Sequence, residues 1–106
     1  MITAIVIKKN HSYYSFECNG HSGYAKRGQD IVCSAVSMLT TNTINSIEKL
    51  TDCDFKGESA DGRLYWEFPD GCNKDASLLM DSMILGLEAV SDEYGKKFLT
   101  LELKEV

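Results

Sequence analysis

The 106-residue sequence has very little proline, a single residue at position 69, and it has no internal repeat or low-complexity segment. These absences argue against a flexible linker and against a repeat architecture. No stretch approaches the roughly 18 consecutive apolar residues that a membrane-spanning helix requires. The first residues also lack the basic stretch, apolar core and cleavage site of a secretion signal. We therefore expect a cytoplasmic protein with no membrane partner.

Basic residues are in the minority, because 11 lysines and arginines face 16 aspartates and glutamates, and the net charge is −5. A protein that grips a phosphate backbone needs a broad basic face. We therefore expect no direct nucleic-acid partner. The four cysteines, at positions 18, 33, 53 and 72, are in a cytoplasmic setting more typical of reduced thiols than of two disulfides.

The length indicates one domain covering residues 1–106, able to bury roughly two-thirds of its unfolded surface. Runs rich in β-branched and aromatic residues, with alternating apolar positions, predict strands, and apolar positions every three or four residues predict helices. The predicted strands cover residues 2–9, 13–19, 55–58, 63–68 and 97–106, and the predicted helices cover about 31–50 and 73–94. This β-β-α-β-β-α-β order, with one apolar face per element, predicts an α+β two-layer sandwich. Two helices would pack on one face of a mostly antiparallel sheet.

Each predicted helix has an apolar stripe that we expect to be buried. The stripe of the first helix, with Thr43 in its gap, consists of Val32, Ala35, Val36, Leu39, Ile47 and Leu50. The stripe of the second helix consists of Ala76, Met80, Met83, Leu87, Val90 and Tyr94. Gly95 follows as a natural end for the second helix.

The stretch 20–33 combines His21, one of two histidines, with Cys33 at the predicted start of the first helix. Asp30 is a candidate N-cap, whose side chain can accept from the backbone N–H of residue 32 or 33. Cys33 would then lie in the first helical turn, beside unpaired N–H groups and the positive end of the helix dipole. A thiol there loses its proton more easily than a free thiol. The pattern predicts a cysteine–histidine site, with helix N–H groups that can bind an oxyanion.

The helix dipole is not sufficient by itself, because it contributes only about 0.3–1 kcal/mol and the charge of Asp30 opposes it. A thiolate at Cys33 therefore also requires His21 as a nearby cation. Simpler interpretations remain open for each residue: a small buried cysteine, an ordinary loop histidine, and an aspartate that only caps the helix. Ser37, one turn after Cys33, can equally bond back to a carbonyl in its own helix.

A metal site is a third class of interpretation, since Cys18, His21 and Cys33 could supply three zinc ligands. The sequence lacks the second paired motif that zinc sites normally have, so we expect no metal.

The residues of this stretch resemble the signature of the ribosomal-processing cysteine protease (Prp) family. The matching segments are Gly20-His21, Gly28, Asp30-Ile31-Val32-Cys33 and Ala35-Val36-Ser37. The family pattern is roughly Gly-His-Ala, a glycine-bearing loop, and then Gly-x-Asp-Ile-Val-Cys-Ala-Ala-Val-Ser. Ser22 and Ser34 stand where alanine is usual, and neither change removes a reacting group. The length and the order of elements agree with the family over the whole chain.

The resemblance implies that Cys33 is the nucleophile and His21 the general base, with possible support from Asp30 and Ser37. It implies a substrate, the precursor of large-subunit ribosomal protein number twenty-seven, whose N-terminal extension is removed around ribosome assembly in bacteria such as the Firmicutes. A homodimer without cofactor or metal is implied as well. The alternative function is a non-catalytic, ribosome-associated protein-binding module, in which Cys33 does no chemistry.

The loop of residues 22–29 joins the two candidate catalytic groups, with Gly23 and Gly28 as hinges. Such a segment can stay open without substrate and close over an extended peptide. We expect this loop to be mobile in the absence of ligand, with His21 and Cys33 beyond hydrogen-bond reach. Tyr24 is a candidate contact for the substrate.

Overall fold

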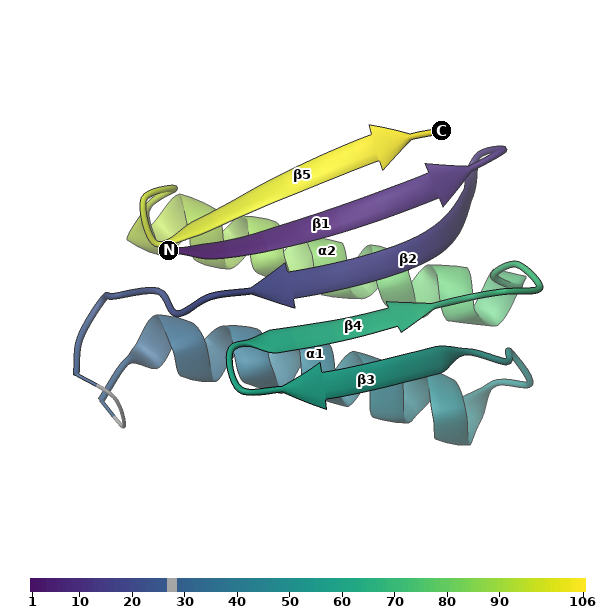
Figure 1. The fold of residues 1–106 in the computed structure, drawn as a ribbon, viewed down its shortest axis with the longest axis horizontal. Helices are drawn as coiled ribbons and strands as arrows, with labels where there is room; N and C mark the ends of the chain where they lie inside the picture. The colour runs from purple at the N-terminus through teal and green to yellow at the C-terminus, as the bar shows by residue number, and fades with distance from the viewer. Residues whose placement is uncertain (27–28) are drawn as a thin grey trace.

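The computed structural model describes residues 1–26 and 29–106, and its elements follow the predicted order (Figure 1). They are β1 (Ile2–Lys9), β2 (Ser12–Asn19), α1 (Ile31–Leu50), β3 (Lys56–Ala60), β4 (Arg63–Glu67), α2 (Lys74–Tyr94) and β5 (Leu99–Glu105). The strands form one sheet in the order β3-β4-β2-β1-β5. Every neighbouring pair is antiparallel except β1 and β5, which run parallel. Figure 1 shows both helices on the same face of this sheet, so the predicted two-layer α+β fold is confirmed.

The turn between β1 and β2 is a two-residue connection made by Asn10 and His11, which have φ angles of 51° and 64°. Two successive residues with positive φ suit the tight hairpin turns whose twist matches that of the flanking strands. Asparagine tolerates this region better than most residues because its short side chain can hydrogen-bond locally. This turn joins β1 to β2, and β2 ends at Asn19, directly before Gly20 and His21.

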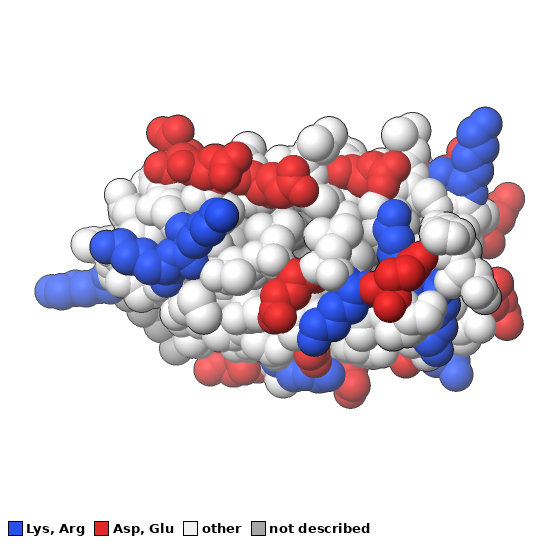
Figure 2. Space-filling view, turned by 90° about the horizontal axis from the view of Figure 1, so that it is seen from above, with Lys and Arg blue, Asp and Glu red and all other residues white. Residues whose placement is uncertain are grey.

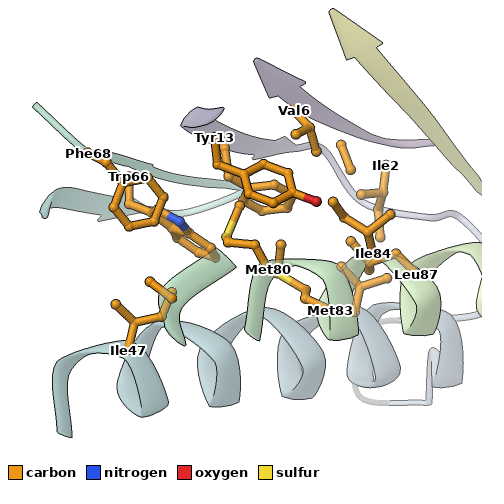
Figure 3. Packing of buried hydrophobic residues seen from close by; sticks show 14 of the residues in the cluster. Ile2, Val6, Tyr13, Ile47, Trp66, Phe68, Met80, Met83, Ile84 and Leu87 are labelled. Atoms are coloured by element: carbon orange, nitrogen blue, oxygen red, sulfur yellow. The ribbon is translucent and has the colours of Figure 1, made fainter. Parts of the chain in front are cut away.

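The core lies between the sheet and the helix layer, as Figure 3 shows for its aromatic, aliphatic and methionine side chains. Phe16 of β2 and Trp66 of β4 pack with their ring centroids 4.7 Å apart. Both are fully buried, together with Met80, Met83 and Leu87 of α2. Full burial of one such side chain contributes about 1.5–3 kcal/mol. These contacts lock α2 against the middle of the sheet.

The predicted stripe of α2 is confirmed: four of its members are buried, and the other two, Val90 and Tyr94, pack against the core from its edge. The stripe of α1 is confirmed only in part. Leu50 is 74% exposed, so its predicted burial is wrong. It is the last residue of the helix, which ends at Thr51, and its side chain is left in solvent.

Thr40 and Thr43 contribute to the buried face of α1 in its place. The hydroxyl of Thr40 donates to the carbonyl of Val36 at 2.9 Å, and that of Thr43 donates to the carbonyl of Leu39 at 2.7 Å. These bonds satisfy the hydroxyl groups, so burial of the threonines leaves no polar group without a partner. A threonine can therefore occupy a buried helix position that apolar periodicity would not assign to it.

We predict that Gly20→Ala lowers the free energy of unfolding more than Gly71→Ala. Both glycines have a strongly positive φ, 94° and 92°, where a side chain costs roughly 1–2 kcal/mol. At Gly71 a methyl group would meet nothing within 4 Å, but at Gly20 it would lie 2.4 Å from the carbonyl oxygen of Met1. We expect losses of about 1 kcal/mol at Gly71 and about 3 kcal/mol or more at Gly20. Urea unfolding measures both, and equal losses would contradict the close approach of Gly20 to Met1.

Candidate active site

Asp30 begins α1 and also holds the loop that precedes it. Its backbone is extended, and its side chain accepts from the backbone N–H of Cys33 at 3.0 Å, so the predicted N-cap is confirmed. The second carboxylate oxygen accepts a hydrogen bond from the hydroxyl of Ser22. That hydroxyl oxygen in turn accepts from the backbone N–H of Tyr24 at 3.1 Å. One carboxylate thus joins the helix start to residues 22–24.

The Asp30 carboxylate carries its charge in a buried position, with 7% of the residue exposed. Burial alone would raise its pKa, but hydrogen bonds from Ser22 and from the backbone N–H groups of Cys33 and Ala25 outweigh it. The pKa is lowered from 3.8 to about 2. The side chain is therefore ionised at neutral pH. In the described part of the chain no hydrogen bond joins Asp30 to His21, so the structure shows Asp30 as a cap rather than as a partner of the imidazole.

Cys33 lies half-buried in the first turn of α1, as its position after the cap requires. The backbone N–H of Ser22 donates to its Sγ at 3.3 Å, within the range for a hydrogen bond to sulfur. Such a donor stabilises negative charge on the sulfur. The backbone N–H of Cys33 itself is occupied by Asp30. This N–H group is therefore not free to bind an oxyanion, and the expectation that other N–H groups of the helix start do so stays a prediction.

The backbone around His21 is held from two sides. The nitrogen of Met1 donates to the carbonyl oxygen of His21 at 2.6 Å, and the N–H of Gly20 donates to the carbonyl oxygen of Gly62 at 2.8 Å. Gly62 has a φ of 73°, and a Cβ placed on it would lie 3.3 Å from Nε2 of His21. The imidazole therefore packs against the glycine of the β3–β4 turn. No hydrogen bond links it to Cys33 among the described residues, in agreement with the expected separation.

His21 and Cys33 nevertheless line one pocket of about 290 Å³. Its walls are the loop after β2, the first turns of α1 including Ser37, and the β3–β4 hairpin with Asp61 and Gly62. The sequence reasoning missed the hairpin wall and the role of Ser22. The only signal for Ser22 was its departure from the alanine that is usual at this position.

Two of the other cysteines are unsuited to nucleophilic attack. Burial is the main cause that raises the pKa of Cys18 to about 11 and that of Cys72 to about 11. Both stay protonated at neutral pH, although Cys18 lies at the same pocket as Cys33. All four cysteines are free thiols, as the sequence predicted.

The three-ligand zinc hypothesis is not supported by the geometry. Among residues 1–26 and 29–106, no three or more histidine, cysteine, aspartate or glutamate side chains come together in a way that could hold a metal ion. Cys18, His21 and Cys33 share a pocket wall but do not form a ligand set.

The loop residues that were predicted to contact substrate are only partly described. Gly23 is exposed with a φ of 73°, and a Cβ there would meet nothing within 4 Å. The ring of Tyr24 packs edge-on against Tyr94 at 5.5 Å and Phe98 at 5.1 Å, which anchors the loop to the end of α2. Gly28, the second predicted hinge, lies outside the described residues. Substrate contact by Tyr24 and loop mobility stay predictions.

A comparison with protein families matches residues 1–98 to the model of the family described as cysteine protease Prp. Among curated proteins, the chain is 32% identical over 100 residues to the ribosomal processing cysteine protease Prp of Bacillus subtilis. That match covers 83% of this chain and 86% of the relative. The protein of the same name from Staphylococcus aureus is 28% identical over 80 residues, covering 74% of this chain and 76% of the relative.

Among solved structures, the chain resembles the essential ribosomal processing protease Prp from S. aureus in complex with a covalently linked product peptide. The TM-score is 0.92 at 25% sequence identity, and the superposition covers 98% of this chain and 100% of the other.

We predict that Asp30→Ala lowers the free energy of unfolding at pH 7 by about 1–2 kcal/mol, because it removes the N-cap of α1. The pKa of Asp30 is lower in the folded protein than its ordinary value of 3.8. Its stabilisation is therefore fully present above about pH 4 and is lost as the pH falls towards 2. The difference in the free energy of unfolding between wild type and Asp30→Ala, measured by urea unfolding, should become smaller as the pH falls from about 4 towards 2.

The matched control for this experiment is Asn73→Ala, because Asn73 caps α2 with a neutral side chain that accepts from the N–H of Ala76 at 2.9 Å. Its cost should stay constant over the same pH range. A constant cost for Asp30→Ala as well would show that the ionised form of Asp30 has no special role.

Proposed function

The chain belongs to the cysteine protease Prp family and is a cysteine-type protease, and from this premise we propose that it removes the N-terminal extension of large-subunit ribosomal protein twenty-seven. The observation that carries the proposal is one pocket lined by both His21 and Cys33, in a chain that matches the family over residues 1–98. Relatives named for ribosomal processing support the substrate assignment.

In the proposed reaction, Sγ of Cys33 attacks the scissile carbonyl carbon while its proton passes to His21. The carbon–nitrogen bond then breaks, and His21 returns the proton to the leaving amine. A thioester joins the N-terminal part of the substrate to Cys33. Water attacks this thioester, gives its proton to His21, and releases the N-terminal product with Cys33 restored as a thiol.

The remaining site residues support this reaction from fixed positions. The N–H of Ser22, 3.3 Å from Sγ, favours the thiolate. Asp30 holds the residues that carry this donor, through the hydroxyl of Ser22. Ser37 lies one turn beyond Cys33 on the pocket wall, where we assign it a supporting contact with the substrate. Gly23, Tyr24 and Gly28 form the proposed substrate loop.

The charge of the surface supports a protein substrate rather than direct contact with RNA. In Figure 2 a row of acidic side chains follows the upper border and further acidic side chains lie among the basic ones, which stand in separate groups without a continuous basic surface on that face. The net charge of −5 has the same sign as a phosphate backbone. None of the helices in the described part of the chain is long and apolar enough to cross a membrane. Because the proposed substrate is made on ribosomes, we place the activity in the cytoplasm.

We predict that Cys33→Ala abolishes cleavage of the ribosomal protein precursor, because it removes the nucleophile. His21→Ala should lower turnover by roughly 10²–10⁴-fold, because it removes the general base. Incubation of each variant with the full-length precursor, followed by mass spectrometry of the products, measures the cleavage.

Two matched controls carry the same substitutions elsewhere. Cys72→Ala changes a cysteine outside the pocket, and His11→Ala changes an exposed histidine in the β1–β2 turn. Both should cleave the precursor at the wild-type rate. Cleavage by Cys33→Ala would refute the assignment. Binding of the precursor by wild type without cleavage would favour the non-catalytic binding module.

We also propose a homodimer. The sheet ends at the edge strand β5, and the exposed apolar side chains Leu103 and Val106 lie in and just after it. Sedimentation equilibrium should give about twice the chain mass of 11.8 kDa. A single species at 11.8 kDa over micromolar concentrations would contradict the dimer.

A further inference from the structure

A second cavity lies beyond the pocket of His21 and Cys33 and continues it. It has a volume of about 270 Å³ and is lined by the C-terminal half of α1 and by the β3–β4 hairpin. Ser59 and Leu64 line both cavities. The two are therefore successive parts of one groove that begins at Cys33.

One side of α1 forms a continuous wall of this groove. The first cavity is lined by Cys33, Ser37 and Thr41, and the second by Asn45 and Glu48. Residues three or four apart lie on the same side of a helix, so these five form a single row. From Cys33 to Glu48 the helix advances 15 residue steps, or about 22 Å at 1.5 Å per step. An extended peptide of about six or seven residues covers that length.

The opposite wall is the inner face of the β3–β4 hairpin. Residues of α1 and residues of this hairpin together line both cavities, so the hollow lies between the helix and the hairpin. Gly57 of β3 pairs with Trp66 of β4, and a Cβ on Gly57 would lie 3.5 Å from the Cβ of Trp66. The missing side chain at Gly57 keeps this part of the groove open.

The far end of the groove is apolar at its base and polar at its rim. Ile44, Phe55 and Leu64 are half-buried there and pack against the core. Asn45 and Glu48 are exposed at the helix side. This combination suits an apolar side chain on a peptide whose backbone remains partly in solvent.

We propose that this groove binds an extended segment of the peptide substrate, with an apolar side chain of the substrate seated on Ile44, Phe55 and Leu64. From Cys33 to Asn45 the helix rises about 18 Å, so this side chain lies about five residues from the scissile bond. The inference rests on the proposed protease function and adds a second recognition point distant from the reacting atoms. The argument for this occupant is the continuity of the groove with the pocket that holds Cys33.

The test fills the far end of the groove from an exposed position. Asn45→Trp places a large ring at its rim without removing any core side chain. Asn42→Trp is the matched control, since Asn42 is an exposed asparagine on the same helix that lines neither cavity. With the full-length precursor, Asn45→Trp should raise KM at least tenfold and leave kcat nearly unchanged. Asn42→Trp should behave as wild type.

Two further measurements separate blocked binding from a damaged site. The rate at which iodoacetamide alkylates Cys33 should be the same in wild type and Asn45→Trp, because this small reagent does not need the groove. Synthetic peptides of the precursor sequence, shortened from either end, should lose kcat/KM with wild type when the residue about five positions from the scissile bond is removed. That loss should be absent with Asn45→Trp.

Each outcome has a distinct meaning. Cleavage by wild type together with an unchanged KM in Asn45→Trp would overturn the proposal that substrate binds in this groove, and would leave the protease function intact. Absence of cleavage by wild type would overturn the protease function and the groove with it. A change of oligomeric state in Asn45→Trp alone would show that a second copy of the chain occupies the groove, and would also overturn the proposal. The shortened peptides, measured with wild type, test whether substrate binds in the groove even if the variant fails to fold.

Discussion

The arrangement of the site depends on the hydrogen bonds that converge on the carboxylate of Asp30. The N–H of Cys33 closes the first turn of α1 on one oxygen, and the hydroxyl of Ser22 ties the preceding loop to the other. The same loop then donates its Ser22 N–H to the thiol. Because these donors hold the carboxylate in its charged form, its pKa stays low in spite of burial. The Asp30 carboxylate therefore sets where Sγ of Cys33 lies relative to the loop that begins at Ser22.

Because both oxygens of the Asp30 carboxylate already accept hydrogen bonds from Cys33 and Ser22, other groups must orient His21. The β3–β4 hairpin contributes to it, because the Gly62 carbonyl accepts from Gly20 and the bare Cα of Gly62 admits the imidazole. The hairpin reaches this position through the pairing of β4 with β2, in which Leu64 lies opposite Cys18 and Arg63 opposite Asn19. The pocket is thus formed by a helix end and a hairpin that are about 30 residues apart in the sequence.

The local features of this protein could be predicted from its sequence, and the features that depend on distant pairing could not. Alternation in the strands, the apolar stripe of α2 and the cap at Asp30 are properties of short segments, and the structure has them where the sequence indicates. The sheet order and the hairpin wall of the pocket arise from non-local contacts, which no short pattern encodes. The wrong assignment of Leu50 has a similar cause, since whether a helix end is covered depends on what packs beyond it. Thr43 was placed in the gap of the predicted stripe, but the burial of Thr40 escaped prediction, because apolar periodicity does not reveal that its hydroxyl finds a partner within the helix itself.

The separation of His21 from Cys33 is consistent with a protease that completes its site when substrate binds. The thiol of Cys33 lies in the first turn of α1 and accepts from the N–H of Ser22. The imidazole of His21 follows the end of β2 and packs against Gly62 of the β3–β4 hairpin. A peptide lying between α1 and the hairpin would contact the helix that carries Cys33 and the hairpin against which His21 packs at the same time. In the proposed mechanism, binding energy gained along the proposed groove can be used to bring His21 to Cys33, which speeds the reaction instead of only tightening substrate binding. An unselected peptide that reached only Cys33 would gain little of this energy, so a protease built in this way would combine a reactive thiol with a narrow choice of substrate.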